Sequence, residues 1–504
     1  MRLPAPGSGW LAGRGALLLA LGGGAALSFA FAPFGLWPLS ILCPALLMAI
    51  WESASPRDAA RQGFAFGVGT FGAGTWWLYI SIHGFGQAPV WLTLLLIVAL
   101  VALMAAWYAL LGWLAVHWLP AGSWRWFAGL PGLWLLTEWC RGWFLSGFPW
   151  LSLGYAHTDS LLRHWAPVAG VYGVSALCLL QAGALLALWR GGAGVRAGAL
   201  ALVAGAWGGA WALAGQPWTH PVGAPVPVAI IQGAIPQDQK WIDDNLEPTE
   251  DRYRALSDQS GDARLIVLPE SAVPELANEI APYLAQLHMS ARRRDADILM
   301  GAIRLADNQA DYYNSLLGLT GSVAFYDKRH LVPFAEYFPV PHFVRSWLRL
   351  MSLPYADFTA GIEGQHPLHA AGLLWAPTIC YEDAFGNDQR SLVAASAALV
   401  NVTNDAWFGH SPARYQHLQI ARMRALEARR DLLRAANDGV SAVIGPDGEL
   451  RATAPEYQPA VLHGTVQGRG GQTPYTAHGD WPLVTLGLLA AAAAAAVRMR
   501  RGPP

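Results

Sequence analysis

Three residues with the chemistry of an acyl-transfer site each follow a short apolar run in the second half of the chain. Glu270 follows LIVLP, Lys328 follows VAFYD and Cys380 follows LLWAPTI. A cysteine thiolate is a good acyl acceptor, but a free thiol is only slightly ionised near neutral pH and needs a nearby base or cation. A carboxylate can take the thiol proton and return it to a leaving group, while an ammonium favours the thiolate and a developing oxyanion. Together the three residues predict a covalent thiol acyl-transfer site.

Each of these residues also has an ordinary structural explanation. Cys380 could be a buried structural thiol, Glu270 could cap the helix-like segment Pro274–Arg294, and Lys328 could be a solvated surface lysine. However, Cys380 is the only cysteine beyond residue 178, and the chain uses lysine only twice, at 240 and 328. Because arginine does not shed its proton, only lysine keeps a titratable amine. We therefore favour the catalytic interpretation of all three.

Composition excludes several other classes of protein and site. The four cysteines, at 43, 140, 178 and 380, are too few and too scattered for a disulfide framework or a CxxC zinc site. We expect no metal and no cofactor. The net charge of −1 lacks the basic surplus that nucleic-acid binding requires, so we expect no nucleic-acid partner.

Short strand-like and helix-like segments alternate between residues 225 and 470. The strand-like segments are Val226–Gln232, Leu265–Pro269, Ile298–Ile303, Ser315–Leu319, Val323–Tyr326, Leu374–Cys380, Leu399–Thr403 and Val440–Ile444. The helix-like segments are Trp241–Ser260, Pro274–Arg294, Asn387–Ala397 and Arg414–Arg430. This pattern predicts a layered α/β domain. Such folds place ligands just past strand ends, where the three candidate residues and the pair Asn404-Asp405 lie.

The first 220 residues have a different composition. They hold 13 charged residues, whereas the remaining 284 hold 54. Seven apolar runs could cross a bilayer, near Gly15–Phe31, Trp37–Trp51, Gly63–Ile82, Val90–Leu111, Leu130–Phe144, Val168–Trp189 and Val195–Leu213, and an eighth, Trp481–Val497, closes the chain. Glu138 and Arg141 interrupt the fifth run, and Trp143–Tyr155 could continue it as an interfacial or re-entrant stretch. We predict a membrane domain over 1–220, a soluble domain over 221–475, and a last span with a tail over 476–504.

Arginine placement predicts the orientation of these spans, because short cytoplasmic loops are enriched in Lys and Arg. Ten arginines (2, 14, 57, 61, 125, 190, 196, 498, 500 and 501) lie on one side, against Arg141 and Arg163 on the other. Both termini are therefore predicted in the cytoplasm and residues 214–480 outside it. A cleaved signal peptide is the alternative for the first span, but Pro33 just after Ala30-Phe31-Ala32 is a poor cleavage context.

Several motifs resemble a known family. LPESAVP around Glu270, YDKRHLVPFAEYFP around Lys328 and ICYED around Cys380 resemble the Glu-Lys-Cys triad of the nitrilase superfamily. FAPFG, TEWCRGWFLSGFPW, QGAIPQDQKW, NDAWFG and HLQIARMRALEARR resemble bacterial apolipoprotein N-acyltransferases in particular. The resemblance covers essentially the whole chain. It implies about eight transmembrane helices with an extracytoplasmic α-β-β-α sandwich, in the bacterial inner membrane with the catalytic domain on the periplasmic side.

The resemblance also implies supporting residues near the nucleophile. Glu336 and Glu382 would tune its pKa or position an acceptor amine, with an ordinary salt bridge as the alternative for each. Tyr381, Trp241, Asn314 and Trp407 would line a pocket or else be plain packing.

The function implied by the resemblance is a ping-pong acyl transfer. A phospholipid would acylate Cys380, and the α-amine of a diacylglyceryl-cysteine at a lipoprotein N-terminus would then take the acyl chain, with the enzyme acting as a monomer. Two alternatives remain: a membrane-tethered amidase that uses water as acceptor, and a transporter with an outer sensor domain. A transporter would need charged residues within the spans, and apart from Glu138 and Arg141 there are almost none.

The stretch Phe338–Phe358 is unusually apolar for a loop of a soluble domain. Long apolar loops of this kind often contact lipid or a partner. We predict a lid that dips toward the outer leaflet, with a core-packing insertion as the alternative.

The arginine asymmetry generates a topology prediction. Reporter fusions after Gln216 and near His478 should report an extracytoplasmic location, and a fusion at Pro504 a cytoplasmic one. A cytoplasmic signal from the fusion after Gln216 would show that the span count is wrong.

Overall fold

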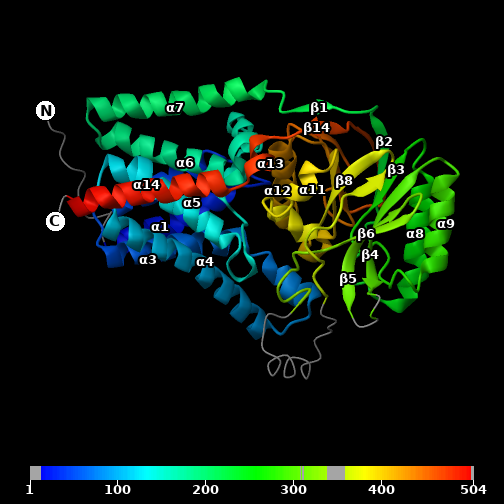
Figure 1. Cartoon of the computed structure of the whole chain (residues 1–504). Helices are drawn as coiled ribbons and strands as arrows, with labels where there is room; N and C mark the ends of the chain where they lie inside the picture. The colour runs from blue at the N-terminus through cyan, green and yellow to red at the C-terminus, as the bar shows by residue number, and fades with distance from the viewer. Residues whose placement is uncertain (1–12, 307, 309–310, 338–357, 501–504) are drawn as a thin grey trace. The chain divides into compact units, whose positions relative to one another are not determined.

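The computed structural model describes residues 13–306, 308, 311–337 and 358–500. The chain divides at 216–217 and at 477–478 into two compact units, which we call the helical unit and the sheet unit (Figure 1). The short segment Gly84–Ala88 belongs with the sheet unit. The predicted lid lies almost entirely outside the described residues.

The helical unit contains apolar helices over most of the predicted spans. They are α1 (Gly13–Leu27), α2 (Leu39–Trp51), α3 (Pro56–Gly74), α4 (Val90–Trp118), α5 (Leu130–Arg141), α6 (Ala166–Arg190), α7 (Ala193–Ala214) and α14 (Trp481–Arg500). In the described part of the chain, five helical stretches have the length and composition to cross a membrane, namely Gly13–Ala30, Val90–Trp118, Leu161–Arg190, Ala193–Ala214 and Trp481–Arg500. The helix α2 is apolar but has only 13 residues. The helical unit is therefore built to sit in a membrane.

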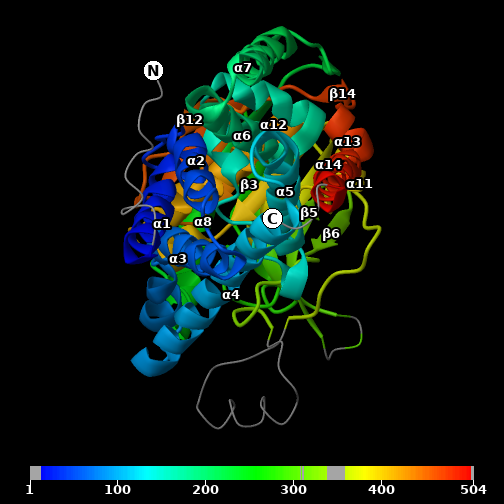
Figure 2. The same cartoon turned by 90° about the vertical axis from the view of Figure 1, so that its left-hand side faces the viewer.

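Glycines let these helices approach closely. A Cβ atom at Gly132 of α5 would lie 2.6 Å from the carbonyl oxygen of Gly487 on α14, and one at Gly24 of α1 would lie 2.0 Å from the carbonyl oxygen of Phe66 on α3. Small residues at such contacts are typical of membrane helix packing. The last helix therefore packs against a helix from the middle of the unit, as Figure 2 shows for α14 and α5.

The fifth predicted span is shorter than expected. The helix α5 ends at Arg141 after 12 residues, and the chain then forms short one-turn segments at Phe144–Ser146, Leu153–His157 and Leu161–Trp165. Two buried charges hold this segment in place. Glu138 Oε1 accepts hydrogen bonds from Trp134 Nε1 and from the Leu153 N–H, while Arg141 donates to the Trp150 carbonyl and to Ser152 Oγ. These two charges thus have structural partners.

The sheet unit contains two six-stranded sheets. In spatial order the first is β13 (Ala460–Val466), β2 (Val226–Gln232), β3 (Leu265–Leu268), β4 (Asp297–Leu305), β5 (Tyr312–Leu319) and β6 (Val323–Asp327). The second is β12 (Leu450–Thr453), β11 (Ala442–Ile444), β10 (Leu432–Ala436), β9 (Ala398–Thr403), β8 (Leu373–Ile379) and β7 (Leu368–Ala370). A separate pair joins β1 (Thr219–Pro221) to β14 (Arg469–Gly471). The strands β2, β3 and β4 are mutually parallel, as are β8, β9 and β10.

The two sheets pack face to face and helices cover their outer faces. Along β3, Leu265 and Val267 belong to the core shared with the second sheet, whereas Ile266 and Leu268 belong to a second core with α8 (Leu246–Asp258) and α9 (Ala281–Arg292). This period of two is expected where both faces of a strand are buried. The helices α11 (Arg390–Ala394) and α12 (Ala413–Ala428) cover the second sheet (Figure 1). The unit is an α-β-β-α sandwich.

The predicted elements differ from the observed ones mainly at helix starts and edge strands. Helix α8 begins at Leu246, five residues later than predicted, and α9 begins at Ala281, after the Pro274 at which it was expected to start. Strands β1, β7, β10, β12, β13 and β14 were not predicted. β13 is an edge strand with mostly half-exposed residues and a glycine, so its alternation is weak, and β10 contains the charged Arg434.

Candidate active site

The three candidate catalytic residues all lie just past the ends of strands in the sheet unit. Glu270 follows β3, Lys328 follows β6, and Cys380 begins a short 3-10 turn, Cys380–Ala384, directly after β8. The backbone N–H of Asn404, just after β9, donates to Glu270 Oε2 at 3.0 Å. This bond links a strand end of one sheet to a strand end of the other and brings the acid to the side of the nucleophile.

A buried ammonium lies between two carboxylates. Lys328 Nζ is 2.8 Å from Glu336 Oε2 and 3.6 Å from Glu270 Oε1, and its side chain is 1% exposed. Asn314 Nδ2 donates to both acids, to Glu270 Oε1 at 2.7 Å and to Glu336 Oε1 at 2.9 Å. The predicted residues Asn314 and Glu336 therefore belong to the same cluster as Glu270 and Lys328.

The charges of this cluster set the protonation state of Lys328. Burial disfavours its ammonium, but the neighbouring Glu336 and Glu270 outweigh burial and raise the pKa of Lys328 above its ordinary value. Lys328 therefore stays protonated over the working pH range. It can supply a fixed cation but not a base, so a proton acceptor in this cluster has to be one of the two carboxylates, Glu270 or Glu336.

Cys380 adopts a backbone conformation that few residues other than glycine adopt. Its φ is +52°, in the left-handed region, which is strained for a side chain with a Cβ. Burial and the charge of Glu270 raise the pKa of its thiol well above the ordinary value, although Lys328 acts to lower it. The resting Cys380 is thus a thiol, which needs a base to remove its proton before it can act as a nucleophile.

Glu382 braces the turn that carries Cys380. It is fully buried, and its Oε2 accepts from the Ile379 N–H at 2.8 Å. Its Oε1 accepts from the N–H groups of Arg329 and His330, at 2.7 and 3.2 Å, and from the Tyr326 hydroxyl. One carboxylate therefore ties the segment after Lys328 to the strand end before Cys380, a positioning role beyond that of an ordinary salt bridge.

Of the three predicted aromatic residues, Tyr381 and Trp241 directly follow Cys380 and Lys240 in the sequence, and Trp407 lies three residues after Asn404. Tyr381 follows Cys380 and packs edge-on against Phe385 at 5.0 Å. Trp241 is 50% exposed and Trp407 37% exposed, and the Trp407 ring contacts Phe85 of the Gly84–Ala88 segment at 6.4 Å. Half-exposed aromatic rings at these places can contact an apolar ligand.

Lys240 is a cluster residue to which the sequence assigned no role. Its amine is fully buried and donates to the backbone carbonyl of Glu270 at 3.2 Å, and burial lowers its pKa to about 8 although Glu270 opposes the shift. On the other side of this backbone, a Cβ at Gly301 would lie 2.5 Å from Glu270 Cα, so only glycine allows β4 to pass so close. The rarity of lysine could have pointed to Lys240 in the sequence. The chain has only two lysines, and both contact Glu270.

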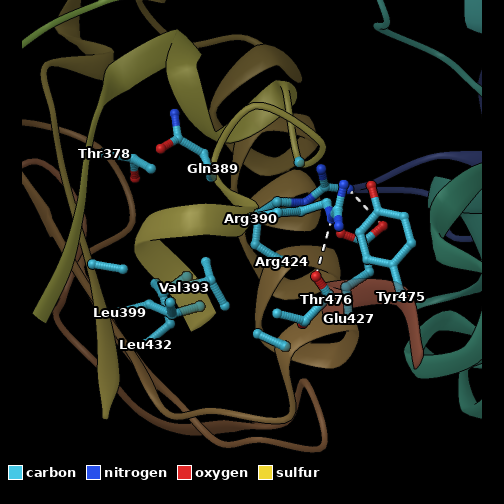
Figure 3. Close-up of a pocket in the computed structure, with 13 residues that line it drawn as sticks. Thr378, Gln389, Arg390, Val393, Leu399, Arg424, Glu427, Leu432, Tyr475 and Thr476 are labelled. Carbon is cyan, nitrogen blue, oxygen red and sulfur yellow. Dashed lines mark hydrogen bonds and ion pairs between the residues drawn. The ribbon is translucent and has the colours of Figure 1, made fainter. Parts of the chain in front are cut away.

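A small cavity lies elsewhere in the sheet unit. It measures about 30 Å³, enough for about one water molecule. Residues of β8, β9, β10, α11 and α12 line it, with Tyr475 and Thr476 (Figure 3). Arg390 Nε donates to the Thr476 carbonyl and Arg424 Nη2 to Glu427. None of Glu270, Lys328 and Cys380 lines this cavity, so it is a packing defect separate from the cluster.

Comparison with known proteins agrees with this architecture. Residues 227–475 match the carbon-nitrogen hydrolase family, which makes the sheet unit a carbon-nitrogen hydrolase domain. Residues 23–184 match the apolipoprotein N-acyltransferase N-terminal domain.

Relatives with both parts are similar over nearly their whole length. The chain is 43% identical to an apolipoprotein N-acyltransferase of Methylococcus capsulatus, over 94% of each chain. It is 42% identical to that of Nitrosomonas europaea, over 95% of this chain and 97% of the relative, and 40% identical to that of Pseudomonas putida, over 92% and 94%. The chain belongs to the apolipoprotein N-acyltransferase family.

The carboxylate pair around Lys328 generates a prediction about stability. Asn314→Asp replaces the shared amide donor with a third acid, and the repulsion should lower the melting temperature of the detergent-purified protein, equivalent to about 1–3 kcal/mol at pH 8. Asn245→Asp at the start of α8, where an acid is favoured, is the control and should melt like the wild type at the same pH. Equal melting of Asn314→Asp and wild type at pH 8 would contradict the proposed packing of charges.

Proposed function

We propose that this protein transfers a fatty acyl chain from a phospholipid to the α-amino group of the diacylglyceryl-cysteine at the N-terminus of an apolipoprotein, with Cys380 as the covalent carrier. The observation that carries the proposal is the buried Glu270–Lys328–Cys380 cluster within a chain of the apolipoprotein N-acyltransferase family. Relatives with this enzyme name match the chain over both the helical unit and the sheet unit, which disfavours the amidase alternative.

In the first half-reaction Cys380 Sγ attacks the ester carbonyl carbon of the phospholipid. Glu270 takes the thiol proton as the carbon–sulfur bond forms, which is required because the resting group is a thiol. Lys328 stabilises the negative charge that develops on the carbonyl oxygen. Glu270 then returns the proton to the departing glycerol oxygen, so lysophospholipid leaves and a thioester remains on Cys380.

In the second half-reaction the acceptor amine attacks the thioester carbonyl. Glu270 accepts a proton from the amine and passes it to the departing sulfur, which regenerates the thiol. The product carries an amide bond. The same three side chains serve both halves, because each half forms and breaks one bond to the same carbonyl carbon.

Both substrates carry acyl chains, which explains why a carbon-nitrogen hydrolase domain is joined to a helical unit with five candidate membrane spans. We propose that the protein works as a monomer in the bacterial inner membrane. Its sheet unit would lie on the periplasmic side and both termini in the cytoplasm. The arginine asymmetry of the loops supports this orientation.

The carrier role of Cys380 can be tested by substitution. Cys380→Ala should abolish both the fatty-acyl adduct and the transfer, because no sulfur remains to hold the chain. Cys380→Ser should be nearly inactive, because a hydroxyl has a much higher pKa and is poorly activated by a carboxylate. Intact-protein mass spectrometry after incubation with phospholipid alone measures the adduct, and an assay with a lipopeptide measures transfer. Full activity in either variant would exclude the covalent mechanism.

Lys328 allows charge to be separated from geometry. Lys328→Arg keeps the positive charge but places a wider planar group between Glu270 and Glu336, which lie 3.6 and 2.8 Å from the ammonium. A displacement of about 1 Å can slow a reaction on the order of a hundredfold. Single-turnover acylation of Cys380 should therefore be strongly and comparably reduced in Lys328→Arg and Lys328→Ala. Near-normal acylation of the arginine variant would reduce Lys328 to a simple electrostatic contributor.

A further inference from the structure

Beneath the turn that carries Cys380 lies a buried cluster of four charged residues that the proposed chemistry does not use. It consists of Asp383, Asp405, His417 and Arg434, each no more than 1% exposed. His417 Nδ1 is 2.8 Å from Asp405 Oδ1 and its Nε2 is 3.1 Å from Asp383 Oδ1. Arg434 contacts Asp405 Oδ2 at 2.9 Å and Asp383 Oδ2 at 3.4 Å. Two cations and two anions therefore balance.

This cluster contacts the backbone of the nucleophile. His417 Nε2 lies 3.2 Å from the Cys380 carbonyl oxygen, and Asn401 Nδ2 lies 3.4 Å from the same atom. Burial and Arg434 lower the pKa of His417, but Asp383 and Asp405 outweigh them and raise it to about 9. As an imidazolium, His417 donates from both ring nitrogens, so the carbonyl of the strained residue Cys380 has a charged donor beside it.

The cluster also reaches the sulfur atom through one hydroxyl. Ile379 of β8 pairs with Val402 of β9 in parallel register, so the next residues, Cys380 and Thr403, are neighbours across the ladder. Thr403 is fully buried. Its Oγ1 lies 3.1 Å from Asp405 Oδ1, and the hydroxyl lies near enough to the Cys380 thiol to lower its pKa.

A hydroxyl has one hydrogen, so Thr403 cannot fully satisfy Asp405 and a thiolate at the same time. Asp405 does not need it. Although burial opposes its charge, Arg434 and His417 hold the pKa of Asp405 below its usual range, and both keep donating to it. Thr403 is therefore free to turn toward sulfur when the thiol loses its proton.

We propose that Thr403 is a further catalytic residue, whose hydroxyl switches from Asp405 to Cys380 Sγ when the thiolate forms. Before attack, the hydroxyl donates to Asp405 and the sulfur carries its own proton. As Glu270 takes that proton, the hydroxyl rotates and donates to the new anion, so no proton is gained or lost at Thr403. When the thioester forms and the sulfur becomes neutral, the hydroxyl returns to Asp405. The switch acts within the proposed function, but it concerns the thiolate of Cys380 whatever electrophile that thiolate attacks.

The experiment measures the reactivity of Cys380 directly, with iodoacetamide as the electrophile. The full-length protein in detergent is alkylated between pH 6 and pH 10, and peptide mass spectrometry follows Cys380 separately from Cys43, Cys140 and Cys178. The charged or titratable groups near Cys380 include Glu270, Lys328, Asp405 and His417, with Tyr381, Glu382 and Asp383 of its own turn, and none of them is altered. Thr403→Val should displace the rate-against-pH profile of Cys380 to higher pH, with rates about tenfold lower at each pH below the plateau.

Thr403→Ser keeps the hydroxyl and should retain the wild-type profile. The matched control is Thr473→Val, which removes an equally buried hydroxyl that donates to the Glu427 carbonyl at 2.6 Å in the same unit. It should leave the profile of Cys380 unchanged. If Thr403→Val does not fold, Thr403→Ala replaces it with the same expectation.

The profile separates a catalytic hydroxyl from a structural one. A wild-type profile in Thr403→Val or Thr403→Ala overturns the proposal, and so does an equal displacement in Thr403→Ser. The outcome is independent of the acyl-transfer proposal. Absence of an acyl adduct on wild-type Cys380 would remove the proposed function, whereas a displaced alkylation profile in Thr403→Val would still establish the switch.

Discussion

The arrangement of the active site depends on one buried ammonium. Lys328 Nζ is removed from water and its charge is tolerated only because Glu270 and Glu336 lie beside it. Those acids in turn require Asn314 to share its amide hydrogens, and Glu270 requires the Asn404 N–H from the other sheet. The contacts that compensate the ammonium of Lys328 therefore join residues at strand ends of the two sheets. The two carboxylates outnumber the single ammonium, and the amide hydrogens of Asn314 together with the Asn404 N–H offset the excess negative charge.

A second buried charge system plays the corresponding role for the nucleophile. The cluster of Asp383, Asp405, His417 and Arg434 is neutral overall and holds the backbone at Cys380. Glu382 completes the brace with hydrogen bonds to backbone N–H groups on two segments. In the proposed reaction the Cys380 sulfur forms a bond to the acyl carbon in the first half and breaks it in the second, so it has to hold one position through both halves. Rigid charge pairs beneath the turn supply that constraint better than loop packing would.

Much of this could be predicted from the sequence, and the remainder depended on long-range contacts. Strand β2 has the bounds that its apolar run predicts, and the candidates Glu270, Lys328 and Cys380 were found because each follows such a run. Thr403 and His417 carry no comparable local signal. Thr403 is the last residue of an otherwise ordinary buried strand, and His417 lies in a helix of which nearly every residue is buried. Although Asp405 was found just past a strand end, its pairing with His417 and Asp383 becomes apparent only in three dimensions. Edge strand β13 escaped prediction because its alternation is weak.

The protonation state of Cys380 connects the two charge systems. Burial and Glu270 raise the pKa of the thiol more than Lys328 lowers it, so the site holds a thiol instead of a preformed thiolate. A thiol at rest resists oxidation, since susceptibility follows thiolate character. In the proposed mechanism the anion forms only during attack, when Glu270 removes the proton and nearby donors stabilise the sulfur. The acid that opposes ionisation at rest would then be the base that permits it during reaction, because moving the proton from sulfur to Glu270 neutralises the charge that opposed it.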